Sequence, residues 1–339
     1  MAHVASPGGE FEVVTGDLPV PGPQEVRIRV EAAGVCRTDA MFVAGAFPGV
    51  GFPLVPGHEI AGRVEALGDA VQGRAVGDRV VVGWFGGECG RCRACRSGDL
   101  MMCPDLLVPG WSMRGGYASH VVVPERALAR VPDGLGLVEA APMGCAGVTA
   151  FNALRHSGAR PGDTVAVLGL GGVGHLAAQF AARSGMRTVV LARGAEKGVL
   201  ARELGAHSYI DTTTGSPAEE LGRLGGAQVI IAAAASAPAA SALLRGLAPR
   251  GRLVVVGVDA EPLTVPTAPL VAAGQVVQGH PAGTAADAEE AMRFAVLHGV
   301  RPMVETAALT EVSEAFARML TGRARLRMVL TPDGDGAPG

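Results

Sequence analysis

Six cysteines are the residues of this sequence whose type and spacing are best suited to chemistry, and four of them are clustered. Cys89, Cys92, Cys95 and Cys103 form a C-x2-C-x2-C-x7-C run. Adjacent C-x-x-C steps let thiolates converge on one tetrahedral zinc, at Zn–S distances of about 2.3 Å. Four protein ligands leave no open coordination position, so this zinc would be structural and would hold together a lobe over residues 87–104. Two disulfides or a chance cluster are the alternatives, and a reducing compartment favours metal over disulfides.

Cys36 and Cys145 are the two remaining cysteines, and His58 lies between them in the sequence. Two thiolates and one imidazole supply three zinc ligands and leave the fourth position open for substrate or water, which is the arrangement of a catalytic zinc. Considered alone, a buried cysteine is more often a packing residue than a metal ligand. The residues alone therefore leave this second metal site open.

A glycine-rich segment provides a candidate nucleotide site. Gly169, Gly171 and Gly174 form G-x-G-x-x-G around Gly172 and Val173. The motif follows a predicted strand, Thr164–Leu168, and opens a predicted helix that ends near Gly185. This context predicts a tight turn, close approach of the backbone to a pyrophosphate, and a positive helix N-terminus.

The end of the second predicted strand bears on the choice of cofactor. It reads Ala192-Arg193, without the acid that would bind an unphosphorylated ribose. Arg193 could pair with a 2′-phosphate, so the sequence favours NADP(H) over NAD(H). Lys197 is the only lysine among 29 basic residues, so composition also explains an arginine at this position.

The elements that must position these residues change in character along the chain. Up to about Val131 the segments are short and rich in valine, glycine and proline, which indicates a β-rich region; examples are Val26–Val30, Gly62–Leu67 and Arg79–Val82. From about Pro161 strands alternate with helical stretches, which predicts a doubly wound parallel sheet. Its six strands are Thr164–Leu168, Arg187–Ala192, Ser208–Ile210, Gln228–Ala232, Arg252–Val258 and Gln275–Gln278.

The pattern changes again after Pro281. We predict a helix, a strand, a second helix and a last strand, followed by a disordered tail over residues 331–339; these elements are Ala285–Leu297, Met303–Thr306, Val312–Leu320 and Arg327–Leu330.

Composition and charge limit the classes of partner that this protein could bind. A net charge of -3 and a pI near 6.3 give no excess of basic surface, so neither nucleic acid nor an anionic membrane is expected. The uncharged segment Leu224–Leu244 contains Gln228, Pro238 and many alanines, which predicts a buried strand and a helix opening after Ser236 rather than a membrane span. No secretory signal is readable at the N-terminus, so we expect a cytoplasmic protein.

Several motifs together resemble the zinc-dependent medium-chain alcohol dehydrogenases, closest to the bacterial and cinnamyl-alcohol-dehydrogenase-like branch. The resemblance covers about residues 15–330. It rests on Cys36 with Asp39, Pro56-Gly57-His58-Glu59, the four-cysteine run, Gly115-Gly116-Tyr117, Cys145-Ala146-Gly147-Val148-Thr149 and Gly169-Leu170-Gly171-Gly172-Val173-Gly174.

The resemblance implies roles for residues around the second metal site. It implies that Cys36, His58 and Cys145 hold a catalytic zinc, with Glu59 as an alternative ligand. Asp39 would accept a hydrogen bond from His58 and fix its tautomer, although an unrelated solvated aspartate is the alternative.

The proton relay departs from the family pattern. The resemblance implies that Thr38 starts the relay, but Met41 stands where many relatives have a histidine, and methionine cannot carry a proton. We hypothesise that Met41, Trp84 and Phe85 instead line an apolar substrate pocket, with ordinary core packing as the alternative.

The resemblance also implies further cofactor contacts. Arg37 and Arg327 would lie at the pyrophosphate, Thr149 near the nicotinamide, and the backbone from Val256 to Val258 beside its ring. A solvated arginine or a satisfied core residue is the alternative at each of these positions.

The fold class implied is α/β, with a β-rich GroES-like catalytic domain, residues 1–147 with a return over 281–339, and a Rossmann dinucleotide-binding domain, residues 148–280. The chemistry would lie in the cleft between the domains. We expect two zinc ions per chain, a small-molecule primary alcohol or aldehyde as substrate, and a homo-oligomer, dimer or tetramer. A polyol or secondary-alcohol dehydrogenase is the alternative enzyme, and an inactive zinc-dependent binding or regulatory protein is the alternative of another class.

Overall fold

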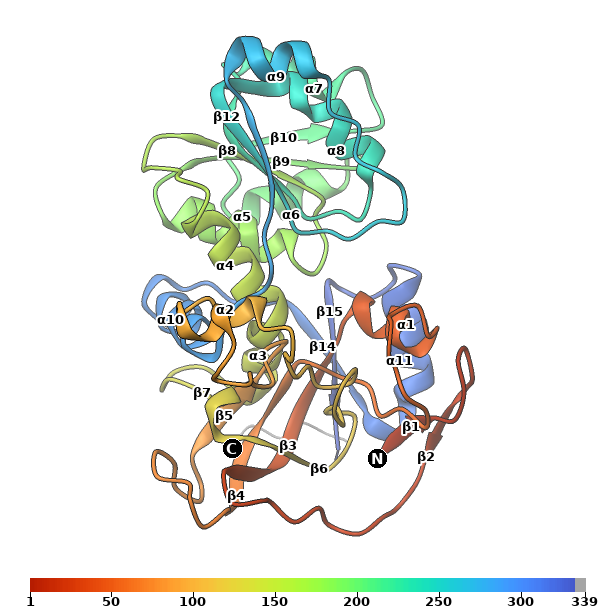
Figure 1. The fold of residues 1–339 in the computed structure, drawn as a ribbon. Helices are drawn as coiled ribbons and strands as arrows, with labels where there is room; N and C mark the ends of the chain where they lie inside the picture. Colours follow the sequence, from red (N-terminus) through yellow and green to blue (C-terminus); the bar gives the residue numbers. More distant parts are fainter. Residues whose placement is uncertain (333–339) are drawn as a thin grey trace. The chain divides into compact units, whose positions relative to one another are not determined.

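The chain folds into two compact units, which are described separately (Figure 1). The structure is a computed structural model that describes residues 1–332. Unit 1 comprises Met1–Val148, Ala282–Leu297 and Arg301–Gly339, and unit 2 comprises Thr149–Pro281 and His298–Val300. The roles assigned to the two regions, catalysis and dinucleotide binding, stay predictions at this point.

Unit 2 is built on a parallel six-stranded sheet in the order β10-β9-β8-β11-β12-β13. This order confirms the predicted doubly wound sheet, in which the chain starts at the centre and builds outward in both directions. The strands are β8 (Thr164–Leu168), β9 (Arg187–Ala192), β10 (Ser208–Asp211), β11 (Ala227–Ala232), β12 (Leu247–Val255) and β13 (Val276–Gly279).

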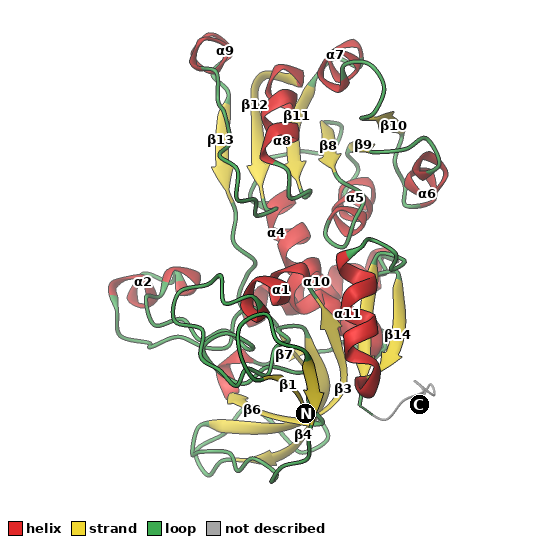
Figure 2. Cartoon of the chain, turned by 90° about the vertical axis from the view of Figure 1, so that its right-hand side faces the viewer, coloured by secondary structure: helices red, strands yellow, loops and turns green. Residues whose placement is uncertain are grey.

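Helices connect these strands on both sides of the sheet (Figure 2). They are α5 (Gly174–Arg183), α6 (Lys197–Glu203), α7 (Pro217–Arg223), α8 (Ala237–Leu243), the 3-10 turn η4 (Leu244–Gly246) and α9 (Thr267–Ala273), and α4 (Val148–Arg155) precedes the first strand. Every residue of β8 is buried, as expected for a strand covered on both faces.

Two sequence predictions in unit 2 have clear outcomes. The uncharged segment forms β11 and α8, and Ser236 caps α8 by accepting a hydrogen bond from the Ala239 N–H at 3.4 Å. The predicted strand Arg252–Val258 is wrong at its end, because β12 stops at Val255. The chain then passes so close to the neighbouring loop that a Cβ on Gly257 would lie 2.5 Å from the Ala234 carbonyl oxygen.

Unit 1 contains a seven-stranded sheet in the order β14-β15-β3-β4-β5-β7, with β6 also paired to β3. Its pairs are antiparallel except β14 with β15. The strands are β3 (Glu25–Val35), β4 (Ile60–Leu67), β5 (Arg79–Val82), β6 (His120–Pro124), β7 (Ala129–Arg130), β14 (Val304–Ala308) and β15 (Arg327–Thr331), and a separate antiparallel pair is formed by β1 (Ala2–Val4) and β2 (Phe11–Val13).

The helices of unit 1 are short except for α10 and α11. They are α1 (Arg37–Val43), α2 (Arg93–Arg96), η1 (Leu100–Met102), η2 (Glu125–Ala127), α3 (Leu137–Pro142), the π-helix η3 (Met143–Gly147), α10 (Ala285–His298), η5 (Leu309–Glu311) and α11 (Val312–Leu320). In α11, Val312, Ala315 and Phe316 recur at helical spacing and pack into the same core as β3 and β15.

The predicted elements after Pro281 are confirmed, with one correction at the C-terminal end. Thr331 was expected in a disordered tail, but it is the last residue of β15 and is 5% exposed, because it pairs with Ala308 of β14. The rest of the predicted tail, from residue 333 onward, lies outside the described residues.

No single helix among residues 1–332 combines the length and the apolar character needed to cross a membrane. One bent pair, Leu137–Gly144 with Ala146–Arg155, has them only when its two helices are taken together.

Candidate metal centres and nucleotide site

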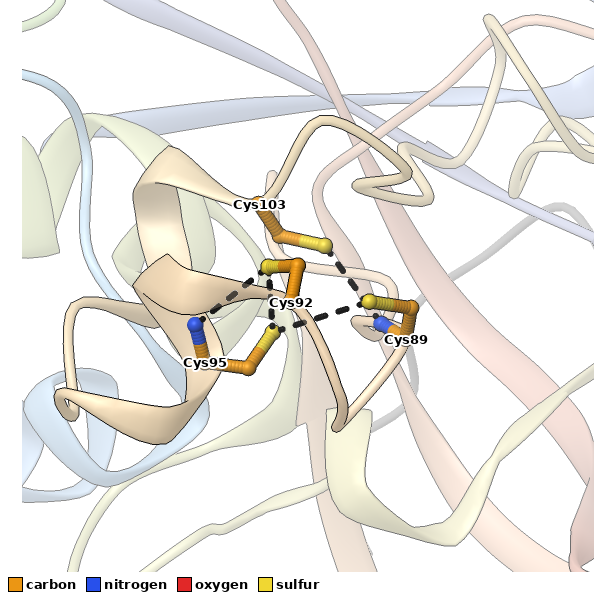
Figure 3. Close-up of side chains that lie close together, drawn as sticks. All are labelled: Cys89, Cys92, Cys95 and Cys103. Atoms are coloured by element: carbon orange, nitrogen blue, oxygen red, sulfur yellow. Dashed lines mark hydrogen bonds between the residues drawn. The ribbon is translucent and has the colours of Figure 1, made fainter.

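The four clustered cysteines converge as a metal site (Figure 3). All four Sγ atoms lie within 4.8 Å of one another; Cys92 and Cys95 are 3.4 Å apart, and Cys89 and Cys95 are 3.9 Å apart. A tetrahedral zinc with bonds of about 2.3 Å separates its sulfur ligands by about 3.8 Å. All six cysteines are free thiols, so the alternative of disulfides is not what the structure shows. The donor set and spacing fit zinc.

Local backbone geometry explains why this lobe brings its sulfurs together. Cys92 caps the short helix α2 and accepts a hydrogen bond from the Cys95 N–H at 3.4 Å. The Cys89 N–H donates to Cys103 Sγ at 3.4 Å. Gly90 and Gly98 have φ values of 70° and 84°, in the region that favours glycine. Backbone N–H donors at Arg91 and Cys92 lower the pKa of Cys89 to about 7, which favours the thiolate.

The second cluster unites Cys36, His58, Glu59 and Cys145, whose ligand atoms all lie within 4.8 Å of one another. Three separate elements deliver them. Cys36 follows β3 at the start of α1, His58 and Glu59 immediately precede β4, and Cys145 lies in the π-helix η3. π-helical turns often occur at functional sites because they redirect single side chains.

Asp39 holds the imidazole of His58. The two residues are fully buried, and His58 Nδ1 lies 2.8 Å from Asp39 Oδ1. In the tautomer that carries its proton on Nδ1, the Nδ1–H group donates a hydrogen bond to the carboxylate. The lone pair of Nε2 is then available to a metal. His58 Nε2 is buried and has no hydrogen-bond partner within residues 1–332. An unpartnered buried nitrogen beside two thiols is the donor arrangement that zinc requires, so this cluster also fits the metal.

The electrostatics of the cluster call for a cation. A hydrogen bond with Cys145 lowers the pKa of Cys36 well below its usual range, and the same bond raises the pKa of Cys145. Burial disfavours protonated His58, but the charges of Asp39 and Cys36 outweigh burial and raise its pKa. Burial raises the pKa of Glu59 to about 7. The raised pKa values of Cys145 and Glu59 mean that further negative charge beside the Cys36 thiolate is disfavoured in this buried volume, and a bound cation would offset that repulsion.

Arg327 occupies a more buried position than a pyrophosphate contact alone would suggest. It is 5% exposed at the start of β15, and its guanidinium forms an ion pair with Glu59. This pairing holds Glu59 Oε2, while Oε1 has no hydrogen-bond partner among the described residues. Glu59 therefore keeps one oxygen available to the cluster, and the pyrophosphate role of Arg327 stays a prediction. Arg37 is exposed on α1.

An aromatic wall adjoins His58. The Trp84 ring lies 5.3 Å from the imidazole, edge to face, and Phe42 lies 5.9 Å from it. Phe47 and Trp111 extend the same cluster. The sequence pattern predicts Trp84 as a pocket residue and singles out none of the other three, because only the fold brings them together. Phe42 carries one signal in the sequence, since it lies one helical turn after Asp39.

Phe85 and Met41 differ from this wall. Phe85 is 3% exposed and lines a small interior space with Ala127, Ala129 and Ala288, as the alternative of core packing describes; a role in a substrate pocket stays a prediction. Met41 lies on α1 and is partly buried, as is Thr38.

In unit 2 the glycine-rich loop has the geometry of a nucleotide cradle. Gly169 has a φ of 95°, and a Cβ on Gly174 would lie 1.8 Å from the Gly169 oxygen, so both positions need glycine. A Cβ on Gly171 would meet nothing within 4 Å. The loop, with Gly172 and Val173, runs from β8 into the N-terminus of α5, where backbone N–H groups favour a pyrophosphate.

The loop after β9 carries Arg193, which is exposed, while Ala192 is buried. Tyr209 Oη donates to the Ala192 and Gly194 carbonyl oxygens at 3.0 and 2.5 Å. Asp211 is an acid near this loop that the motif does not predict. It accepts hydrogen bonds from the Gly194 N–H at 3.0 Å and from the backbone N–H and hydroxyl of Thr213. The neighbouring acid is thus already engaged in building the loop.

The remaining predicted cofactor residues lie at separate points of unit 2. Thr149 is 8% exposed on α4. Val256 and Val258 follow the carboxyl end of β12, and Val258 is 63% exposed. Ligands of doubly wound sheets bind outside the carboxyl ends of the strands, so both valines lie at the appropriate edge.

Comparisons with known proteins identify the family of the chain. The alcohol dehydrogenase GroES-like domain family matches residues 22–133, and the zinc-binding dehydrogenase family matches residues 172–296. The chain is 43% identical to an alcohol dehydrogenase of Penicillium expansum over 93% of this chain and 92% of the relative. An Aspergillus alcohol dehydrogenase is 42% identical over 96% of each chain.

Solved structures give the same result. A cinnamyl alcohol dehydrogenase from Sorghum bicolor is 30% identical to this chain, with a TM-score of 0.89. The match covers 100% of this chain and 99% of the sorghum chain. These matches confirm the predicted α/β fold class, GroES-like plus Rossmann. The chain belongs to the zinc-binding medium-chain alcohol dehydrogenase family.

Proposed function

We propose that this protein transfers hydride between a primary alcohol and a nicotinamide cofactor, and runs in reverse as an aldehyde reductase. The observation that carries the proposal is the convergence of Cys36, His58 and Cys145, with the unpartnered Nε2 of His58 among them. Three protein ligands leave an open position, which a purely structural metal site does not need. Zinc held there would supply a Lewis acid that lowers the pKa of an alcohol hydroxyl or polarises an aldehyde carbonyl.

The residues around the metal site have separate tasks in this mechanism. Asp39 keeps His58 in the tautomer that presents Nε2. Thr38, two residues after Cys36 on α1, offers a hydroxyl that can accept the substrate proton and pass it on. Trp84 and its aromatic neighbours exclude water from the side of His58 on which they pack.

Metal analysis together with turnover tests this function. We expect two zinc ions per chain, one in each cysteine site, and reduction of a nicotinamide cofactor by primary alcohols. Bound zinc without turnover of any alcohol or aldehyde would support the alternative of a binding or regulatory protein. A clear preference for polyols or secondary alcohols would support the alternative enzyme class.

The aromatic wall supports a medium-sized or aromatic substrate. Phe47, Trp84 and Trp111 are partly buried and pack around the fully buried Phe42, so these three rings offer apolar surface in the aromatic cluster beside the metal ligand His58. Aromatic rings pack edge to face or offset on such surfaces, with about 0.5 to 1.5 kcal/mol of gain beyond area burial. An aromatic primary alcohol should therefore have a higher kcat/KM than ethanol.

Replacing Met41 with histidine tests the proton path. Histidine titrates near pH 6.5 and accepts a proton only above its pKa, so the variant should gain a new ionisation and oxidise alcohol faster above that pH. The pH profile of kcat for hydride transfer measures this. Met41→Leu is the matched control and should keep the original profile. An unchanged profile in the histidine variant would argue against a relay that passes this position.

We also propose a preference for NADP(H) over NAD(H). Arg193 is exposed on a loop whose backbone Tyr209 and Asp211 hold in place, so the backbone needs little ordering before the guanidinium meets a 2′-phosphate. A homo-oligomeric state and a cytoplasmic location stay predictions from the sequence.

Replacing Arg193 with alanine should raise the KM for NADP(H) about 10-fold or more, because a charge-assisted hydrogen bond contributes roughly 1.5 to 3 kcal/mol. The KM for NAD(H) should not change. Steady-state kinetics with both cofactors measures the effect. Arg223→Ala removes an exposed arginine from α7 and serves as the control. Equal effects on the two cofactors would contradict the assignment.

A further inference from the structure

Asp39 is the centre of a buried hydrogen-bond network that extends beyond His58. Its Oδ1 faces His58 Nδ1 at 2.8 Å and the Gly57 N–H at 3.3 Å. Its Oδ2 accepts from the Cys36 N–H at 2.9 Å and from Tyr117 Oη at 2.9 Å. The carboxylate is fully buried, so protein donors must replace all of its water. Two donors on each oxygen fix how the carboxylate is rotated.

Tyr117 enters this network from another part of the chain, 78 residues after Asp39. The ring is fully buried. Burial and the neighbouring Asp39 raise the pKa of the Tyr117 phenol well above its usual value, so the hydroxyl remains a proton donor. The contact is therefore a hydrogen bond to a charged acceptor, which is stronger than one between neutral groups.

The backbone around Tyr117 is also paired with the segment that precedes His58. The N–H groups of Gly115, Gly116 and Tyr117 donate to the carbonyl oxygens of Val55, Gly57 and Pro56, at 2.8, 2.8 and 3.0 Å. These three bonds place the tyrosine beside the loop that carries the zinc ligand.

The glycines of this pairing are required by close approach. A Cβ on Gly57 would lie 2.5 Å from the Tyr117 ring, and Gly57 has a φ of 104°. A Cβ on Gly115 would lie 2.2 Å from the Pro56 oxygen, and one on Gly116 would lie 2.4 Å from Ile60. The Gly115-Gly116-Tyr117 motif is therefore shaped to hold Tyr117 against the ligand loop.

We propose that Tyr117 is a positioning residue for the catalytic metal site, which acts by holding the Asp39 carboxylate in the orientation that His58 needs. The proposal rests on the proposed function of that site. Without the phenol, Asp39 Oδ2 keeps only the Cys36 N–H as a donor, and the carboxylate gains freedom to turn away from His58 Nδ1. Loss of such outer hydrogen bonds typically weakens metal binding about 10- to 100-fold.

The test is zinc binding by Tyr117→Phe, which removes one oxygen atom and keeps the ring. Competition with a chromophoric chelator should show that one zinc per chain binds about 10- to 100-fold more weakly, while the zinc of the four-cysteine lobe is unchanged. Cobalt substitution should shift the visible absorption bands of one metal only. Tyr209→Phe deletes the phenol of the only other tyrosine and should leave both zinc affinities unchanged.

A double-mutant cycle separates positioning from packing. If Tyr117 acts through Asp39, Tyr117→Phe should change zinc affinity much less in an Asp39→Asn background than in the native protein. Equal effects in both backgrounds, or native zinc affinity and cobalt spectra in Tyr117→Phe, would overturn the proposal. Because the readout is metal affinity, it gives an answer even if the protein oxidises no alcohol, so the two proposals fail separately.

Discussion

Replacing Cys145 with alanine is expected to remove one of two zinc ions and to lower kcat/KM for alcohol oxidation by about 1,000-fold or more. Of the three zinc ligands that the resemblance implies, the substitution leaves only Cys36 and His58. Glu59 remains as an oxygen donor beside them. Polarisation by a metal contributes several kcal/mol to a transition state, and each 1.36 kcal/mol is a factor of about ten in rate. Zinc analysis and steady-state kinetics measure the two effects.

The comparison between the two metal sites controls this experiment. Cys145→Ala should leave the zinc of the four-cysteine lobe in place and the far-ultraviolet circular dichroism unchanged. If the variant kept both zinc ions and its turnover, Cys145 would be a packing residue, the alternative that the sequence left open.

Replacing Cys103 with alanine should remove the other zinc ion, that of the four-cysteine lobe, and should unfold the lobe. Cys103 is 6% exposed, but no residue of α2 is buried, so the lobe has little apolar packing of its own. Structural zinc contributes roughly 10 kcal/mol or more to small zinc domains, which packing of this lobe does not replace. Limited proteolysis should then cut within residues 87–104, and zinc analysis should show one ion per chain.

Met102→Ala is the matched control in the same lobe. Met102 is 52% exposed and supplies no metal ligand, so the variant should keep two zinc ions and resist the protease. Cleavage of both variants at equal rates would show that the lobe does not depend on its metal. Substrate turnover by Cys103→Ala should fall less than in Cys145→Ala, because the ligands of the catalytic site are intact.

The parallel sheet of unit 2 was predictable because its signals are local. Each buried strand reads as a short apolar run, and the glycine motif lies at the junction of β8 and α5. The end of β12 was not predictable, since valines continue to Val258 with Gly257 as the single interruption, and the close approach of Gly257 to the Ala234 backbone depends on the fold.

The aromatic wall beside His58 also shows which features depend on the fold. Trp84 and Phe85 are neighbours with similar side chains, and no sequence pattern separates the one beside His58 from the one in the core. Phe47 and Trp111 come from loops whose course depends on packing around Phe42.

The sequence by itself determined the four-cysteine metal site, the glycine-rich nucleotide loop and the order of the elements that carry them, whereas the structure was needed to bring Cys36, His58 and Cys145 together. Spacing of a few residues specifies these features, because backbone geometry limits where nearby side chains can reach. Only the tertiary structure decided how the ligands are held. Glu59 meets Arg327 across 268 residues of sequence, and Tyr117 reaches Asp39 across 78. Such contacts depend on how strands pair and bury polar groups together, which no local pattern of residues encodes.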